Sequence, residues 1–247
     1  MVELLFIGSV VGLLSGFFGI GGGTLLVPLL LLSGFDIKSA VGISVVQMVF
    51  SSIYGSYLNQ KKGTLDISMV FIIGVGGFLG AFLSGYIAVF VPSIVLESIF
   101  FSFVLFALGR LFFQVKEVPE QKEVSKFILF PIGVVIGLFS MLVGVGGSIM
   151  LVPILVGFLH VPLKRATSAG LFFVVFSSVS GLISHTINGH IDYFSGVVIG
   201  LASLVGVYIG IHLKHKTSNE ISKRLLMFFY ICIVIYLAYR IFFLSNP

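Results

Sequence analysis

The sequence predicts an all-α polytopic membrane protein built from two inverted repeats, and three observations lead to this. First, hydrophobic residues make up 58% of the chain and charged residues 9%, whereas a soluble domain carries roughly a quarter charged residues. Runs without charged residues cover 4–35, 67–96 and 127–159, and each exceeds the ~20 apolar residues that cross a bilayer. The other two observations are an internal repeat and the distribution of Lys and Arg.

Eight apolar segments are expected along the chain. Because Glu3 stands where a signal peptide is basic, and no cleavage pattern follows, the first segment is interpreted as part of the membrane domain. The polar stretch QVKEVPEQKEVSK (114–126) is interpreted as a cytoplasmic linker between two transmembrane repeats, 1–113 and 127–247. The segments lie at about 4–33, 39–59, 67–90, 93–113, 127–159, 166–185, 193–213 and 221–244.

The two halves of the chain repeat each other. At an offset of 125, residues 12–30 agree with 137–155 at ten of nineteen positions. At an offset of 126 the agreement continues through pairs such as Ser51/Ser177 and Asp66/Asp192. Paired repeats of this kind are the usual construction of a secondary transporter.

The first and fifth segments contain glycine clusters, GFFGIGGGTLLVP (16–28) and MLVGVGGSIMLVP (141–153). Each glycine in a helix costs about 1 kcal/mol relative to alanine, so the clusters predict a break. Thr24 and Ser148 stand where an N-cap would begin a second half-helix, with Pro28 and Pro153 near its first turn. Unpaired backbone inside a bilayer must be lined by protein or water, so each turn is expected to face a site.

Lys and Arg distribution discriminates between two topologies. With eight full crossings, the two sides receive seven basic residues each. If the two broken segments are re-entrant hairpins, one side holds only Lys38 and Arg240 and the other holds the remaining twelve of fourteen. The positive-inside rule favours the hairpin topology over eight crossings. The hairpin topology has three crossings per half, both termini outside, and loops near 61, 116–126, 164 and 214–224 in the cytoplasm.

Inversion would bring the two glycine turns together near the middle of the membrane, where half-helix N-termini carry partial positive charge. Since the apolar segments around them lack Lys and Arg, amide dipoles and hydroxyls would hold an anion. The predicted substrate-binding residues are Gly19, Gly21, Gly22, Gly23, Thr24, Ser44, Gln47, Ser51, Gly144, Gly146, Gly147, Ser148, Ser168 and Ser177.

Each candidate has a structural alternative. Glycines in membrane helices often serve close packing, and a serine hydroxyl can bond its own helix. Gln47 is the stronger candidate because a buried amide needs partners. The glycine clusters lack the Lys-Ser/Thr of a P-loop, no HExxH motif occurs, and Cys232 is the single cysteine. The sequence thus predicts no catalytic residues, metal site, cofactor or nucleic-acid partner; its expected partners are a small anion and the lipid bilayer.

Several stretches resemble the TauE/SafE sulfite exporter family, also called toluene sulfonate uptake permeases (TSUP). They are GLLSGFFGIGGGTLLVPLLL with its echo GLFSMLVGVGGSIMLVPIL, AVGISV with ATSAGL, and NQKKGTLD with HTINGHID. The resemblance covers nearly the whole chain. It departs from the family pattern at Ile43, where a Thr is usual, and at Met141, which replaces the first glycine of the second motif.

The resemblance implies transport of sulfur-containing anions, such as sulfite or organosulfonates, across a prokaryotic inner membrane. Together with the residues, it favours a transporter that exposes a central site alternately to the two sides. A passive anion channel is the nearest alternative. A membrane-embedded enzyme is much less favoured, because no nucleophile-base pair or metal set is found on matching faces. A homo-oligomer is compatible with the sequence.

Overall fold

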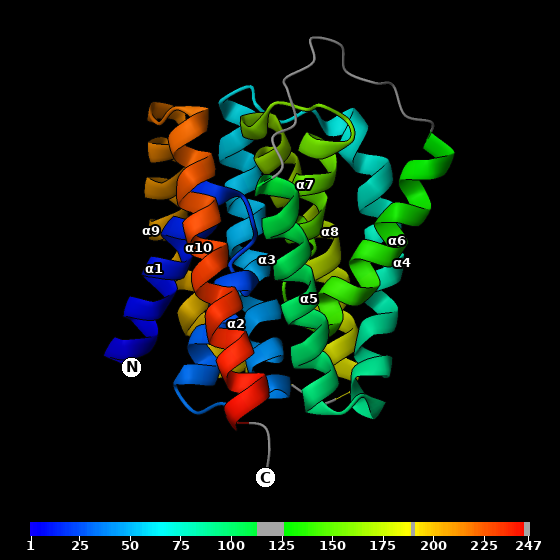
Figure 1. The fold of residues 1–247 in the computed structure, drawn as a ribbon, viewed down its shortest axis with the longest axis vertical. Helices are drawn as coiled ribbons and strands as arrows, with labels where there is room; N and C mark the ends of the chain where they lie inside the picture. The colour runs from blue at the N-terminus through cyan, green and yellow to red at the C-terminus, as the bar shows by residue number, and fades with distance from the viewer. Residues whose placement is uncertain (113–125, 189–190, 245–247) are drawn as a thin grey trace.

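The computed structural model describes residues 1–112, 126–188 and 191–244, which form a bundle of helices (Figure 1). No β-strand occurs among these residues. The predicted linker lies outside the described residues except for Lys126. The helices are α1 (Val2–Phe18), α2 (Gly23–Leu32), α3 (Ile37–Lys61), α4 (Ile67–Phe90), α5 (Ser93–Phe112), α6 (Lys126–Leu142), α7 (Ser148–Gly157), α8 (Leu163–Ile187), α9 (Tyr193–Lys216), α10 (Asn219–Tyr239) and a π-helical turn, η1 (Arg240–Leu244).

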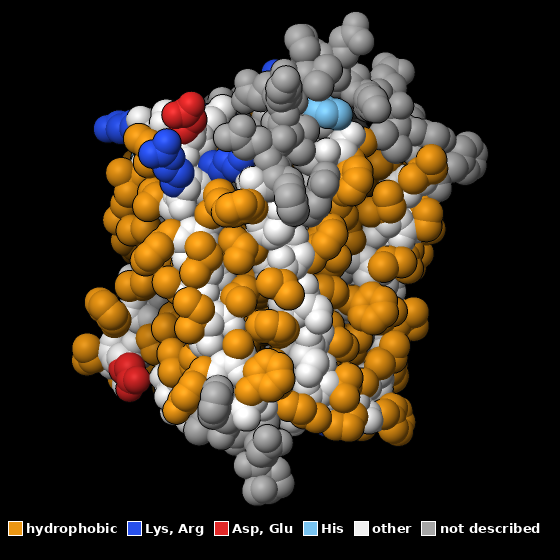
Figure 2. Space-filling model, in the orientation of Figure 1, with side chains coloured by type: hydrophobic (Ala, Val, Ile, Leu, Met, Phe, Trp, Pro, Cys, Tyr) orange, Lys and Arg blue, Asp and Glu red, His pale blue; other side chains and the backbone are white. Residues whose placement is uncertain are grey.

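Five of the described helices are long and apolar enough to cross a membrane: Ile37–Lys61, Val70–Phe90, Leu163–Ile187, Tyr193–Lys216 and Asn219–Phe242. Shorter apolar helices accompany them. Figure 2 shows a wide hydrophobic belt around the visible face, with Lys and Arg side chains gathered at its upper edge. This distribution is typical of a multi-pass membrane protein, in which the apolar belt faces lipid.

The predicted breaks in the first and fifth apolar segments are confirmed. α1 and α2 are separated at residues 19–22, and α6 and α7 at 143–147. The glycines in these turns adopt left-handed backbone angles that other residues rarely take. Positive φ occurs at Gly19 (67°), Gly21 (64°), Gly144 (68°), Gly146 (80°) and Gly147 (88°).

The predicted capping of the half-helices is wrong. Gly22 and Gly147 occupy the N-cap positions of α2 and α7, so Thr24 and Ser148 lie inside the helices, and neither helix has a side-chain cap. Glycine supplies the required backbone turn by itself, which lets each helix begin before or at the hydroxyl residue. Pro28 and Pro153 are each the sixth residue of ten-residue helices, beyond the first turn. Each removes one backbone hydrogen bond from its helix.

Glycine stripes let helix backbones lie very close together. A Cβ added to Gly12 of α1 would overlap the backbone of Ser203 in α9, and one added to Gly80 of α4 would overlap Val134 in α6. Such close approaches are typical of membrane helices, where small residues replace the missing hydrophobic driving force. α1 and α9, and α4 and α6, are accordingly among the most extensively packed helix pairs.

One ion pair joins the end of the chain to α5. Arg240 Nε lies 3.1 Å from Glu97 Oε1, and the Glu97 side chain is only 4% exposed. Arg240 Nη1 also donates to the Leu31 carbonyl oxygen at the end of α2. Glu97 is therefore enclosed by protein, and the pair ties together α5, α2 and the end of α10.

Replacing Arg240 by Met should destabilise the fold by about 3 kcal/mol, because a buried carboxylate that loses its partner keeps its desolvation cost. The double variant Arg240→Met/Glu97→Gln should recover most of this loss, since it removes the uncompensated charge. Thermal unfolding of the purified variants in detergent measures both effects. A double variant no more stable than Arg240→Met would contradict this account of the pair.

Candidate functional site

The two glycine turns meet inside the bundle. Gly23, the first residue of α2, packs so closely against Gly144 that an added Cβ would overlap the Gly144 carbonyl oxygen. Both turns and their neighbours are buried. Two segments separated by more than a hundred residues in sequence thus form one backbone junction.

Met48 of α3 and Val174 of α8 each lie against glycines of both turns. A Cβ at Gly23 would lie 2.9 Å from Met48 Sδ, and one at Gly146 would lie 2.7 Å from the same sulfur. Val174 of α8 similarly approaches Gly21 and Gly146. Met48 and Val174 are 126 residues apart in sequence, the offset of the repeat. The junction is therefore lined equivalently from both halves.

Hydroxyl groups fix the second turn. Ser44 of α3 donates to the Gly144 carbonyl oxygen at 2.8 Å, and Ser177 of α8 donates to the Gly146 carbonyl oxygen at 2.8 Å. Both serines thus lie at the junction and hold its backbone. Thr24 and Ser51 donate instead to carbonyls in their own segments, Ile20 and Met48, at 3.4 Å each.

Gln47 is the most informative polar side chain at the junction. It is completely buried, and neither its Oε1 nor its Nε2 has a hydrogen-bond partner among the described residues. The amide lies directly against Gly22, where an added Cβ would overlap it. A buried amide without partners costs free energy, which makes Gln47 a candidate for contact with a ligand or a water molecule.

The same position in the second half is apolar. Phe173 lies 126 residues after Gln47, is fully buried, and packs against Gly147 as Gln47 packs against Gly22. One side of the junction therefore presents an amide and the other an aromatic ring. Equivalent positions of the two halves thus carry an amide in one and an apolar ring in the other.

The beginnings of α2 and α7 add electrostatic character. Neither has a side-chain cap, and the hydroxyl of Ser148 is buried without a partner among the described residues. The first amides of a helix have no intrahelical acceptors and carry the positive end of its dipole. Uncapped helix N-termini of this kind favour anions.

Ser168 lies in a different cluster from the turns. Its hydroxyl is 3.0 Å from Lys214 Nζ and 2.9 Å from Thr64 Oγ1. Lys214 also donates to Asn59 Oδ1 at 3.1 Å and is only 2% exposed. The structure therefore gives Ser168 a hydrogen bond to the buried Lys214 and none to the backbone of the glycine turns.

The assignment of Lys214 to a cytoplasmic loop is wrong, because the residue lies within α9. A sequence signal for its burial exists in the spacing of Val207, Ile211 and Lys214. These residues follow one another at intervals of four and three, so they share a helix face, and the first two are fully buried.

The described residues contain no cluster of three or more His, Cys, Asp or Glu able to hold a metal ion. A cavity of about 620 Å³ lies between α5, α6 and α7, lined mainly by apolar side chains including Ile99, Phe103 and Met150. It is not lined by the turns. The residues of both glycine turns are buried in this conformation.

Comparisons with known proteins place the chain in a family. The family model described as "Sulfite exporter TauE/SafE" matches residues 4–237. A probable membrane transporter protein of Methanocaldococcus jannaschii is 30% identical over 240 residues, covering 88% of this chain and 87% of the relative. The probable membrane transporter protein YdhB of Bacillus subtilis is 24% identical, covering 86% and 89%.

A probable membrane transporter protein of Haemophilus influenzae is 27% identical over 198 residues, with 75% and 73% coverage. No solved structure matches the chain. The family match spans nearly the whole sequence, glycine turns included, and the relatives named here are all described as membrane transporters. The protein is therefore a membrane transporter of the TauE/SafE family.

Proposed function

We propose that the protein transports small sulfur-containing anions of the sulfite or organosulfonate type through a site at the glycine junction. The observation that carries this proposal is Gln47, a buried amide with two unpartnered polar atoms lying against the start of α2. The substrate would be held by this amide and by the uncapped N-termini of α2 and α7. The matched family is described as a sulfite exporter, which supports sulfite as the first substrate to test.

The asymmetry of the junction suits this class of anion. Sulfite presents oxygen acceptors that the Gln47 amide and backbone N–H groups can satisfy. An organosulfonate adds an apolar group, which Phe173 on the opposite side would accommodate. Because the site would hold the anion by dipoles rather than by a full charge, binding can be reversible, as transport requires.

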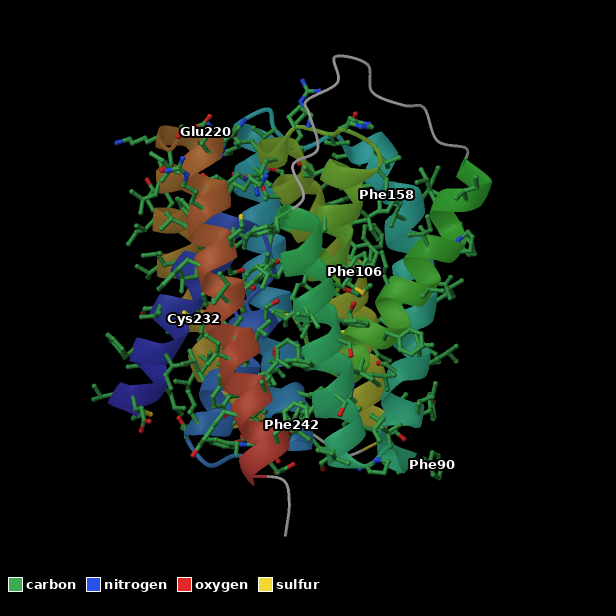
Figure 3. All side chains as sticks on the ribbon, viewed as in Figure 1. Phe90, Phe106, Phe158, Glu220, Cys232 and Phe242 are labelled. Atoms are coloured by element: carbon green, nitrogen blue, oxygen red, sulfur yellow. The ribbon has the colours of Figure 1, made fainter. Side chains whose placement is uncertain are left out.

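The two halves are, in this proposal, inverted repeats with re-entrant hairpins. α1 packs parallel to α9, since Gly8 meets Ile199 and Gly16 meets Val207. α6 packs parallel to α4, since Gly76 meets Phe130 and Gly80 meets Val134. α4 ends at the lower edge, marked by Phe90, whereas α9 ends near the upper edge, where Glu220 follows it (Figure 3). α1 and α6 then run in opposite directions, which supports the inversion.

The upper edge in the figures is proposed to be cytoplasmic. Lys and Arg side chains gather there in Figure 2, and α10 runs from Glu220 at this edge to Phe242 near the opposite one (Figure 3). The positive-inside rule assigns the basic edge to the cytoplasm of an inner membrane. Both chain termini would lie outside. Movement of the α1–α2 and α6–α7 hairpins would expose the junction to each side in turn.

Proteoliposomes loaded with radiolabelled sulfite test the function. The purified protein should produce a flux that saturates with sulfite concentration and that unlabelled organosulfonate inhibits. Empty liposomes and liposomes containing the Gly23→Ala variant are the controls. A flux that rises linearly with concentration would indicate a passive channel instead, and no flux above empty liposomes would overturn sulfite as substrate.

A further inference from the structure

The second polar cluster, around Lys214, holds a buried lysine amine whose partners among the described residues are all neutral. Lys214 Nζ donates to Asn59 Oδ1 and Ser168 Oγ, both neutral acceptors. The ion pair found among the described residues joins Arg240 to Glu97, and no carboxylate pairs with Lys214 in that part of the chain. A buried ammonium is costly unless it is paired. A bound anion would offset this cost and favour the charged form of Lys214.

Free donors converge at the same place. An ammonium has three N–H donors, and its two acceptors among the described residues, Asn59 Oδ1 and Ser168 Oγ, leave one of them available. Asn59 is fully buried, and its Nδ2 has no partner among the described residues. Because Asn59 Oδ1 accepts from Lys214, its Nδ2–H₂ group is the remaining, donor face of the amide. Three N–H donors without partners and one positive charge form a cradle suited to an oxyanion.

The cluster borders the first glycine turn. A cavity of about 10 Å³, enough for about one water molecule, is lined by Lys214, Thr167 and Phe18, among others. Phe18 is the last residue of α1, and Gly19 after it packs against the Thr167 backbone. The cavity is smaller than an oxyanion, so an anion could enter only if one of its walls, such as the end of α1, moved. Movement of the end of α1 would also open the first glycine turn.

The repeat shows that the fold itself does not require the lysine. A second cavity, also about 10 Å³, is lined by Lys38, Val41 and Ala88 among others. At an offset of 126 these residues correspond to Lys164, Thr167 and Lys214, and the first two line the Lys214 cavity as well. Ala88 in the first half occupies the position that the buried Lys214 occupies in the second half. Lys38 and Lys164 line the two cavities equivalently, so the additional, buried Lys214 is what distinguishes the end proposed to be cytoplasmic.

We propose that Lys214 and Asn59 form a second anion-binding site, between the cytoplasm and the glycine junction, that takes oxyanions such as sulfite. This inference rests on the proposed function for the identity of the anion and the direction of its path. The site captures the substrate anion when the end of α1 moves away and passes it to the uncapped start of α2. Because the first half has Ala88 in place of Lys214, the site would exist at one membrane face and not at the other.

Anion-dependent thermal stabilisation of the purified protein tests the site separately from transport. Sodium sulfate is titrated against detergent-solubilised protein, with gluconate keeping the ionic strength constant. The wild type should be stabilised with a saturable dose dependence. Lys214→Gln should lose this response, whereas Lys216→Gln, an exposed lysine at the end of the same helix, should keep it.

Asn59→Asp is the decisive variant because it preserves size and fold. Its carboxylate would pair with Lys214, act as an internal counter-ion and fill the role of the bound anion. The variant should be at least as stable as the wild type without sulfate, yet should not respond to sulfate. A merely structural Lys214 would leave the sulfate response of Asn59→Asp unchanged, and that result would overturn the proposal. A wild type without sulfate stabilisation would also overturn it.

Flux measurements and sulfate-dependent stabilisation test the glycine junction and the second anion site separately. Gln47→Leu should abolish flux but keep the Lys214-dependent sulfate response, because the two sites are separate. Lys214→Gln should raise the half-saturating sulfite concentration on the cytoplasmic side about tenfold, the loss expected for one charge-assisted hydrogen bond. If the wild type shows no sulfite flux but keeps the Lys214-dependent sulfate response, the proposed function fails while the second anion site stands.

Discussion

Gly23→Ala should abolish sulfite transport, with a loss on the order of a hundredfold, as expected for a site displaced by about 1 Å. The added methyl group would overlap the Gly144 carbonyl oxygen, a backbone atom that the Ser44 hydroxyl holds in place. The two turns must separate to admit it. Because Gly23 is helical with an ordinary backbone conformation, the effect arises from contacts with Gly144, Ser44 and Met48 and not from backbone strain.

Gly109→Ala is the matched control for this variant. Gly109 is also helical, in α5, but an added Cβ there meets nothing within 4 Å. Transport should be unchanged. Gly23→Ala should also lose about 1–3 kcal/mol of stability through overpacking. Flux per inserted molecule and thermal unfolding measure the two effects, and wild-type flux in Gly23→Ala would contradict a site at the junction.

Gln47→Leu should stabilise the protein and at the same time abolish its transport. Replacing a buried amide whose polar atoms lack partners by an apolar side chain removes a desolvation cost of about 1–3 kcal/mol. The equivalent position holds Phe173, so an apolar side chain fits beside such a turn. Transport should be lost because the substrate loses its side-chain hydrogen-bond donor. Thermal unfolding and sulfite flux should therefore change in opposite directions.

Ser56→Ala is the control for Gln47→Leu. The Ser56 hydroxyl is also buried in α3 without a partner among the described residues, but Ser56 lies nine residues further along the helix. This variant should gain a little stability and keep full transport. If Gln47→Leu retains wild-type flux, Gln47 does not bind the substrate and the proposal fails at its central residue.

The broken segments illustrate what local sequence can predict. Four glycines in the five residues 19–23 interrupt a helix wherever the segment is placed, so the turn between α1 and α2 follows from backbone conformational freedom. The sequence predicts that Thr24 caps the start of α2, but Gly22 provides the N-cap, so the helix begins at Gly23. The membrane class likewise follows from composition, which requires no knowledge of contacts.

Residue partners, in contrast, depend on helices distant in sequence. Ser44 and Gln47 share a face of α3, yet one bonds a carbonyl 100 residues away and the other lies unpaired against Gly22. Ser168 is a polar residue of a central segment, as Ser44 is, but the packing of α8 against α3 and α9 places it beside Lys214. The spacing of residues along one helix shows which residues share a face. The neighbouring helices determine which residues that face contacts.

The sequence by itself determined the membrane class, the repeat, the family resemblance and the two interrupted helices, because hydropathy and glycine density act locally along the chain. Only the tertiary structure decided that the turns touch, that Gln47 has no hydrogen-bond partner among the described residues, and that Lys214 is buried within α9 and not in a loop. The physical reason is that burial and hydrogen-bond satisfaction are properties of three or four packed helices together. No single segment encodes them.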